Sequence, residues 1–202
     1  MKVRHITILV LALLIADQIL KIWIKTNLHL GEAIVVIPDW FQLLFVENNG
    51  AAFGMQITSA GGFDWGKLAL SLFRVVLVGG LGYYIYKLVR QKAPTGVVVG
   101  LTLILAGALG NILDSTFYGV LFSASTPAQV AEFGGSYAPL MMGKVVDMFY
   151  FPLIESTFPD WLPIWGGKDF IFFRPVFNFA DSCISVGVIY MLLFQYKYFS
   201  RQ

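Results

Sequence analysis

The stretch Phe177-Asn178-Phe179-Ala180-Asp181-Ser182 stands at the start of an apolar run that continues to about residue 199. It brings a carboxylic acid to the edge of a segment whose composition suits a lipid bilayer. A carboxylate in hydrocarbon costs at least about 2.5–3.5 kcal/mol, so an acid in this setting predicts a functional site. A second acid, Asp147, lies in an equally apolar setting at residues 143–149. We expect Asp147 and Asp181 to face each other, held in place by the other spans.

The composition predicts an integral membrane protein. The 202 residues are 57% hydrophobic and only 13% charged, with a mean hydropathy of +0.73, whereas soluble domains carry about 25% charged residues. The formal net charge of +2 gives no reason to expect nucleic acid as a partner. The single cysteine, Cys183, excludes an internal disulfide and a cysteine-based metal cluster. With only His5 and His29, a histidine-ligated metal is also not expected, and we predict no cofactor.

Four apolar runs predict four transmembrane helices in one domain covering residues 1–202. The expected spans are about 6–24, 67–89, 97–114 and 177–199. The first run is long and has no small-residue cleavage site, so we read it as an uncleaved helix rather than a signal peptide. Asp17 and Lys21 lie four residues apart in it and are predicted to form a structural pair.

The third span is rich in small residues, which predicts a central, closely packed helix. It ends in Asn111 and Asp114, which share a face because they lie three residues apart. Two readings stay open for these residues: a polar cluster that holds the span, or a contact with substrate.

The two long connections, residues 26–65 and 115–176, contain shorter elements. Residues 34–37 and 41–46 predict two short strands around a turn, which we expect to form a small sheet against the membrane surface. Residues 158–165 predict an interfacial segment. Lys and Arg are concentrated in both termini and the 90–95 linker, so these should be cytoplasmic and the long connections on the outer side.

Two neighbouring carboxyl groups cannot both ionise cheaply, so one keeps a proton near neutral pH. The pair then supplies a base that activates water and an acid that protonates a carbonyl oxygen, which is the chemistry of peptide hydrolysis. Asn48 and Asn178 could orient the pair or a substrate amide. Two alternatives remain: the acids cap helices at the interface, or they carry protons or ions in a small transporter or assembly factor. A transporter would place its acids near mid-membrane and show repeated halves.

Five short boxes bring these residues together in one order. They are Asp-Gln-Ile-Leu-Lys at 17–21, Asn-Asn-Gly-Ala-Ala-Phe at 48–53, Gly-Ala-Leu-Gly-Asn-Ile-Leu-Asp at 107–114, Val-Val-Asp at 145–147 and Phe-Asn-Phe-Ala-Asp-Ser at 177–182. In this set and order the chain resembles lipoprotein signal peptidase (signal peptidase II), a family of bacterial membrane aspartic proteases. These enzymes remove the signal peptide from prolipoproteins.

The resemblance implies Asp147 and Asp181 as the catalytic dyad, with four supporting or substrate-binding residues: Asn48, Asn111, Asp114 and Asn178. It implies an α-helical membrane protein with four transmembrane helices, an extracytoplasmic β-cradle near residues 30–60 and an extracytoplasmic interfacial helix before the last span. The implied substrate is a diacylglyceryl-modified prolipoprotein, cleaved just before the lipidated cysteine. The resemblance further implies a monomer in the bacterial inner membrane, in contact with membrane lipid and inhibited by globomycin-type peptides.

Two departures from the family pattern bear on the site. Ser115 follows Asp114 where the family usually has arginine, and the segment 115–144 is longer than the family pattern. We hypothesise that Arg74, Lys144 or Arg174 supplies the missing positive charge.

Overall fold

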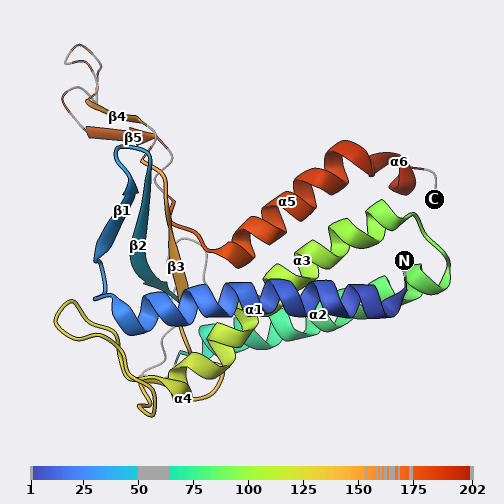
Figure 1. Cartoon of the computed structure of the whole chain (residues 1–202), viewed down its shortest axis with the longest axis horizontal. Helices are drawn as coiled ribbons and strands as arrows, with labels where there is room; N and C mark the ends of the chain where they lie inside the picture. Colours follow the sequence, from blue (N-terminus) through green and yellow to red (C-terminus); the bar gives the residue numbers. More distant parts are fainter. Residues whose placement is uncertain are drawn as a thin grey trace.

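The computed structural model describes residues 2–49, 64–152, 154–157, 169–172 and 175–200, together with residues 159, 161, 163 and 167. In this part of the chain, four long helices run side by side and a small sheet stands across one end of them (Figure 1). Both termini and the linker between the second and third helices lie at the opposite end (Figure 1). The long helices are α1 Val3–Asn27, α2 Trp65–Arg90, α3 Thr95–Leu113 and α5 Phe179–Phe194.

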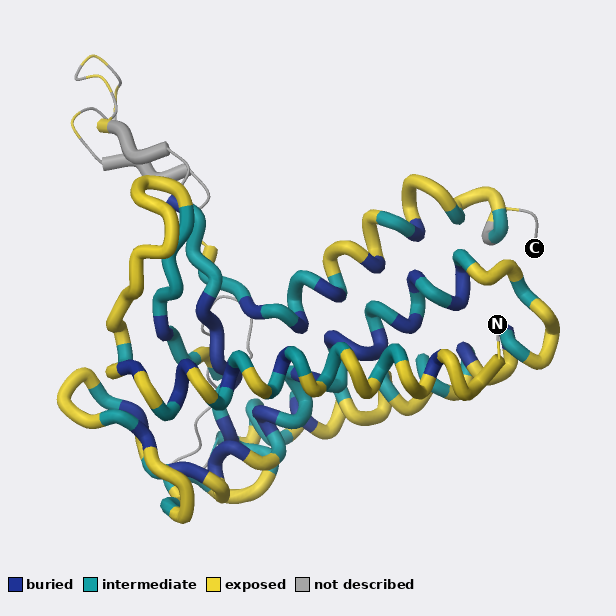
Figure 2. The backbone as a smooth tube through the Cα atoms, in the orientation of Figure 1, coloured by how far each residue is buried: buried dark blue, intermediate teal, exposed yellow. Residues whose placement is uncertain are grey.

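Three of these helices are long and apolar enough to cross a membrane: α1, α2, and α3 with its continuation to Leu121. The fourth, α5, is equally apolar but has 16 residues. The faces that the helices turn to one another are buried, and their outward faces are exposed (Figure 2). The outward side chains are themselves apolar, as expected for helices surrounded by lipid, and include Ile8, Ile19, Val76, Leu192 and Leu193.

The helix at the third predicted span does not end at residue 114. It continues through a π-helical turn, η2 Asp114–Tyr118, into α4 Gly119–Leu121. In this wide turn the carbonyls of Ser115 and Thr116 accept hydrogen bonds from the backbone N–H groups of Gly143 (2.8 Å) and Met141 (3.1 Å). The returning chain therefore supplies partners for carbonyls that a regular helix would have used itself.

The fourth predicted span, 177–199, is divided in the structure. Residue 177 belongs to an isolated β-bridge with Phe149, and Asn178 is the N-cap of α5. At the other end, Gln195 leaves the helical conformation, and the short helix α6, Tyr196–Phe199, follows. An apolar run alone does not reveal these boundaries, because they are set by hydrogen bonds at the helix ends.

Helix α3 is central, as its small residues predict, and packs against α1, α2 and α5. Glycines allow the closest of these approaches. A Cβ atom on Gly107 would lie 2.2 Å from the carbonyl oxygen of Ala180 in α5, and one on Gly187 of α5 would lie 2.8 Å from the carbonyl oxygen of Gly100. The backbones of α3 and α5 therefore touch along the first half of α5.

The sheet at the end of the bundle has three antiparallel strands in the order β1-β2-β3. They are β1 Ala33–Ile37, β2 Phe41–Asn48 and β3 Val145–Tyr150. The first two strands were predicted from the sequence and are confirmed. The third was not, because its partner strand lies about a hundred residues earlier in the chain. In the register, Val46 of β2 is opposite Asp147 of β3.

A second, two-stranded sheet pairs β4 Ile154–Thr157 with β5 Asp169–Phe172. The predicted interfacial segment at 158–165 connects these two strands and lies mostly outside the described residues. The interfacial helix therefore stays a prediction.

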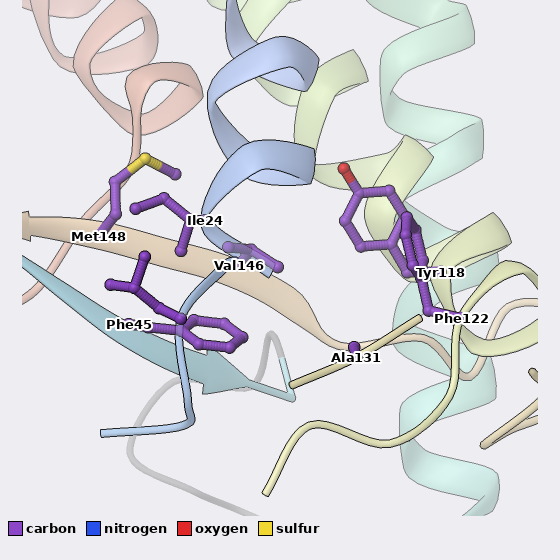
Figure 3. Close-up of a cluster of buried hydrophobic side chains, with 8 residues drawn as sticks. Ile24, Phe45, Tyr118, Phe122, Ala131, Val146 and Met148 are labelled. Atoms are coloured by element: carbon purple, nitrogen blue, oxygen red, sulfur yellow. The ribbon is translucent and has the colours of Figure 1, made fainter. Parts of the chain in front are cut away.

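A hydrophobic cluster joins the sheet to the helices (Figure 3). Ile24 at the end of α1 packs with Phe45 of β2 and with Val146 and Met148 of β3, and the cluster extends to Tyr118 and Phe122 after α3. These side chains are almost completely buried. Because the cluster connects α1, the end of α3 and two strands, it fixes the sheet relative to the helix ends.

Candidate active site

Strand β3 and helix α5 bring the two predicted acids to one place. The backbone N–H of Phe149 donates to the carbonyl oxygen of Phe177 at 2.7 Å, and the N–H of Phe177 donates back at 3.1 Å. This bridge places the start of α5 beside the edge of β3. Asp147 lies two residues before the bridge and Asp181 four residues after it, so both carboxyl groups reach the same junction.

The start of α5 is a capping box, which fixes the side chain of Asp181. The backbone N–H of Asp181 donates to Asn178 Oδ1 at 2.9 Å, and Asp181 Oδ2 accepts from the backbone N–H of Asn178 at 3.3 Å. The capping role considered for an acid at this position is therefore present. It also holds the Asp181 carboxylate at the positive end of the helix dipole.

Asp147 is 3% exposed and accepts one hydrogen bond on each carboxyl oxygen. Asn178 Nδ2 donates to Oδ1 at 2.7 Å, and Asn48 Nδ2 donates to Oδ2 at 3.0 Å. Burial raises the pKa of Asp147 to about 6, and the nearby charge of Asp181 acts in the same direction, while the two amide hydrogen bonds oppose it. One carboxyl group of the pair, that of Asp147, therefore has a pKa close to neutral pH.

Asn111 and Asn178 link the two acids. Asn111 Nδ2 donates to Asp181 Oδ1 at 2.8 Å, and Asn178 Nδ2, which reaches Asp147, also lies 3.1 Å from Asn111 Oδ1. The chain of contacts therefore runs from Asp147 through the two carboxamides to Asp181. All four residues were predicted from the sequence to belong to one site, and the structure brings them together.

Lys21 stands behind this chain and is completely buried. Its ammonium group has three acceptors: Asp114 Oδ2 at 2.7 Å, Asn111 Oδ1 at 2.9 Å and Asp17 Oδ2 at 3.1 Å. The predicted pair of Asp17 and Lys21 is present, and Asp114 completes an ion triad. A buried lysine tolerates this position only because its charge and all three N–H donors are matched.

The two carboxylates of the triad also hold the backbone near the dyad. Asp17 Oδ1 accepts from the backbone N–H of Ala180 at 2.9 Å, and Asp114 Oδ2 accepts from that of Val146 at 3.3 Å. Ala180 precedes Asp181 and Val146 precedes Asp147, so each bond anchors the residue before a dyad acid. Of the two readings left open for Asp114, the structure supplies contacts for the one in which it holds the polar cluster.

Gln18 and Tyr118 also belong to the network, although sequence reasoning did not assign them. Gln18 Nε2 lies 2.9 Å from Asp114 Oδ1 and 3.1 Å from Asp17 Oδ2, and the Tyr118 hydroxyl donates to Gln18 Oε1 at 3.0 Å. Gln18 stands between Asp17 and Lys21 in an otherwise apolar span, which was the available signal. Tyr118 gave none, because the helix was expected to end before it.

A cavity of about 370 Å³ opens beside Asp181, between α2, α3 and α5. Most of its walls are apolar, and three polar residues line it: Asp181, Asn111 and Arg74. A cavity with apolar walls and a few polar groups is the usual form of a site for a small or extended apolar ligand. Among the residues that the structure describes, no group of three His, Cys, Asp or Glu side chains is arranged to hold a metal ion.

The three candidates for the missing positive charge lie in different surroundings. Lys144 Nζ lies 3.3 Å from Glu47 Oε2, and Arg174 falls outside the described residues. Arg74 lines the cavity together with Asp181 and interacts electrostatically with its carboxylate. At the position after Asp114, the hydroxyl of Ser115 is turned back onto the carbonyl of Asn111, to which it donates at 3.0 Å. Arg74 is therefore the described candidate that lies beside the dyad.

Known proteins resemble this chain in both sequence and fold. A protein of Porphyromonas gingivalis named lipoprotein signal peptidase is 53% identical over 193 residues, which cover 94% of this chain and 82% of that protein. One of the same name from Amoebophilus asiaticus is 34% identical, covering 89% of this chain and 72% of its own length. A solved bacterial membrane enzyme shares the fold with a TM-score of 0.63 at 24% identity, covering 98% of this chain and 91% of its own. The family model described as signal peptidase (SPase) II matches residues 9–197, and the chain therefore belongs to the signal peptidase II family of proteases.

Proposed function

We propose that this protein is a membrane aspartic endopeptidase that uses Asp147 and Asp181 to cleave the signal peptide from prolipoproteins. The bond cleaved lies just before a cysteine that carries a diacylglyceryl group. One observation carries the proposal: two carboxyl groups, linked by the carboxamides of Asn111 and Asn178, lie at the end of a membrane bundle beside an apolar cavity.

The hydrolysis balances with the groups present. One carboxylate removes a proton from water, the resulting hydroxide attacks the scissile carbonyl carbon, and the protonated partner gives its proton to the carbonyl oxygen. This produces a neutral tetrahedral diol. In the second step the carboxyl group that gained the water proton gives it to the leaving nitrogen, and the other takes back a proton from a diol hydroxyl as the C–N bond breaks. The products are a carboxylic acid and an amine, and the pair regains its starting protonation.

The cavity supports the choice of substrate. Its walls come from residues in the middle and at the sheet end of three apolar helices, among them Leu77, Leu81, Ile104 and Ile184. An apolar signal segment would be removed from water in such a site, while the polar backbone of the scissile bond would meet Asp181 and Asn111 at its polar end. The lipid chains on the cysteine keep the bond near the bilayer, where the site lies.

Orientation follows from the distribution of charge in the fold. Lys2 and Arg4, the linker cations Lys87, Arg90 and Lys92, and Lys197 all belong to the end of the bundle opposite the sheet. By the positive-inside rule this end faces the cytoplasm, so the sheet and the dyad belong on the outer side of the inner membrane. We infer a monomer, because the described site draws all its residues from one chain.

The competing reading, a carrier of protons or ions, is less well supported. A carrier would hold its acids near the middle of the spans. Asp147 instead belongs to a strand, β3, outside the membrane-spanning helices, and Asp181 lies in the first turn of α5 at the same end. Acids in this place can reach both water and a peptide bond held at the membrane surface.

The test is cleavage of a diacylglyceryl-modified prolipoprotein by the purified protein in detergent. We expect wild type to release the signal peptide, and Asp147→Asn and Asp181→Asn to lose activity while keeping the wild-type melting temperature. A globomycin-type peptide should block the wild-type reaction. Full activity in both folded variants, or no cleavage by wild type of any of several lipidated substrates, would contradict the proposal.

A further inference from the structure

The hydrogen bonds behind the dyad have fixed directions, and this assigns different roles to its two acids. The chain of hydrogen bonds begins at the ammonium group of Lys21. An ammonium group can only donate hydrogen bonds, so the atom of Asn111 that faces it at 2.9 Å must be the carbonyl oxygen. The amide nitrogen of Asn111 then points to Asp181 Oδ1 at 2.8 Å as a donor. Lys21 therefore prevents this carboxamide from reversing.

Asn178 is fixed in the same way from the other side. Its oxygen accepts from the backbone N–H of Asp181 at 2.9 Å, and a backbone N–H cannot become an acceptor. Its amide nitrogen must therefore be the donor that reaches Asp147 Oδ1 at 2.7 Å and Asn111 Oδ1 at 3.1 Å. The carboxamide orientations of Asn111 and Asn178 are consequently consistent with each other and with Lys21.

Three of the four carboxyl oxygens in the dyad thus receive hydrogen bonds from donors that cannot reverse. They are both oxygens of Asp181, bonded by Asn111 Nδ2 and the backbone N–H of Asn178, and Oδ1 of Asp147. An oxygen that carries the acidic proton is itself a donor and accepts poorly, so a proton on any of the three would weaken a bond that the fold fixes. The fourth oxygen, Asp147 Oδ2, accepts from the side-chain amide nitrogen of Asn48 at 3.0 Å, and this amide lies outside the chain of contacts that Lys21 and the cap of α5 direct.

The charges around the pair favour the same assignment. Six elements carry charged groups around the site. The groups are Asp17 and Lys21 of α1, Glu47 of β2 (paired with Lys25), Arg74 of α2, Asp114 after α3, Asp147 of β3 and Asp181 of α5. Lys21 is shared with two carboxylates of its own and also acts on Asp147, where its charge lowers the pKa, whereas the guanidinium of Arg74 acts on Asp181. The N-terminal end of α5 adds a partial positive charge beside Asp181. Burial of Asp147, which raises its pKa to about 6, acts in the complementary direction.

We propose that Lys21 is a positioning residue of the active site. It fixes the carboxamide of Asn111, while the backbone N–H of Asp181 fixes that of Asn178. Together these make Asp181 the ionised member of the dyad, so that Asp181 is the base that takes the water proton. Asp147 then holds the catalytic proton and gives it to the carbonyl oxygen of the peptide bond. This inference rests on the proposed endopeptidase function and adds the division of labour within it.

The side-chain amides of Asn48 and Asn111 allow each acid to be tested separately, because Asn48 contacts Asp147 and Asn111 contacts Asp181. Removing a donor from either carboxylate moves its titration to higher pH, by about one unit for one charged hydrogen bond. In a bell-shaped profile of kcat/KM the rising limb reports the base and the falling limb reports the acid. We therefore expect Asn111→Ala to move the rising limb up by about one pH unit, and Asn48→Ala to move the falling limb. Lys21→Gln removes the charged donor from Asn111 Oδ1 and should move the same limb as Asn111→Ala, by less, because Asn178 Nδ2 still holds Asn111 Oδ1.

The measurement is the pH profile of cleavage of a diacylglyceryl-modified prolipoprotein peptide, with folding of each variant checked by its melting curve. If Asn48→Ala moves the rising limb and Asn111→Ala the falling one, the roles are reversed and the proposal is wrong. It also fails if both variants move both limbs equally. A wild-type protein that cleaves no lipidated substrate would instead contradict the endopeptidase function itself.

A second measurement does not depend on activity. It therefore tests the assignment of the proton even if the Asn48, Asn111 or Lys21 variant is inactive or unfolded. Infrared difference spectra at pH 5 compare wild type with Asp147→Asn and with Asp181→Asn. We expect the band of a protonated carboxyl group to disappear in Asp147→Asn and to remain in Asp181→Asn. Loss of the band in Asp181→Asn alone would place the proton on the other acid and overturn the assignment.

Discussion

Adding one methyl group to Gly107 should disable the site without touching any of its polar residues. The new Cβ in Gly107→Ala would lie 2.2 Å from the carbonyl oxygen of Ala180 and 2.7 Å from Cγ1 of Ile184. The first spacing is more than 1 Å short of the 3.4 Å at which ordinary contact begins, and the obstacle is backbone, which cannot rotate away. Helix α5 must therefore move by about 1 Å at the residue that precedes Asp181. A displacement of this size in a catalytic group can cost about 100-fold in rate.

The assay is kcat/KM for cleavage of a diacylglyceryl-modified prolipoprotein, with the melting temperature measured on the same samples. The matched control is Gly79→Ala in α2, where an added Cβ has nothing within 4 Å. We expect Gly107→Ala to lose about 100-fold in kcat/KM and the control to stay within about twofold of wild type. Wild-type activity in Gly107→Ala, or an equal loss in the control, would refute the reasoning that backbone contact between α3 and α5 positions the dyad.

Two further predictions follow from buried charges. Lys21→Met leaves the carboxylates of Asp17 and Asp114 buried without their cation. The free energy of unfolding should therefore fall by about 3–5 kcal/mol. Thermal unfolding in detergent measures this change, and Lys2→Met, at an exposed position, is the control. For Asp147, whose pKa is raised to about 6 from an ordinary 3.8, the folded state holds the proton more tightly than the unfolded chain does. Its contribution to stability should therefore decrease as the pH rises from about 4 to about 6. Since the dyad needs that proton, kcat/KM should also fall above about pH 6, and a profile that stays flat to pH 8 would contradict this.

The parts of the fold that composition controls could be predicted from the sequence. Apolar length located the helices, because a bilayer requires about 20 apolar residues from each spanning helix. Hydrogen bonds between distant segments set the remaining boundaries. The helix that was expected to stop at residue 114 runs on to Leu121, because Gly143 and Met141 return to satisfy the carbonyls of its π-helical turn. No local pattern records a partner that lies about 25 residues away.

The site shows the same division between local and distant information. Asp147, Asp181, Asn111 and Asn178 could be identified as one group because polar residues are rare and costly in apolar sequence. Which atom faces which could not be identified, since the answer depends on the placement of Lys21 from a different helix. Strand β3 was missed for a related reason. Its residues are almost all apolar and buried, so they lack the alternation by which a half-exposed strand is recognised.

The long segment 115–144 acquires a structural role once its contacts are considered. Lys25, at the end of α1, is fully buried and forms an ion pair with Glu47 of β2. Ser125 closes this pair, since its hydroxyl lies 2.8 Å from Lys25 Nζ and 2.9 Å from Glu47 Oε1, and the ring of Tyr137 covers the ammonium group at 5.0 Å. Both Ser125 and Tyr137 come from the long segment.

Without that cover, water would reach the pair and screen it, and the contact that ties β2 to α1 would weaken. Glu47 is followed directly by Asn48, which donates to Asp147. The segment therefore stabilises, through one buried ion pair, the strand that presents Asn48 to the dyad.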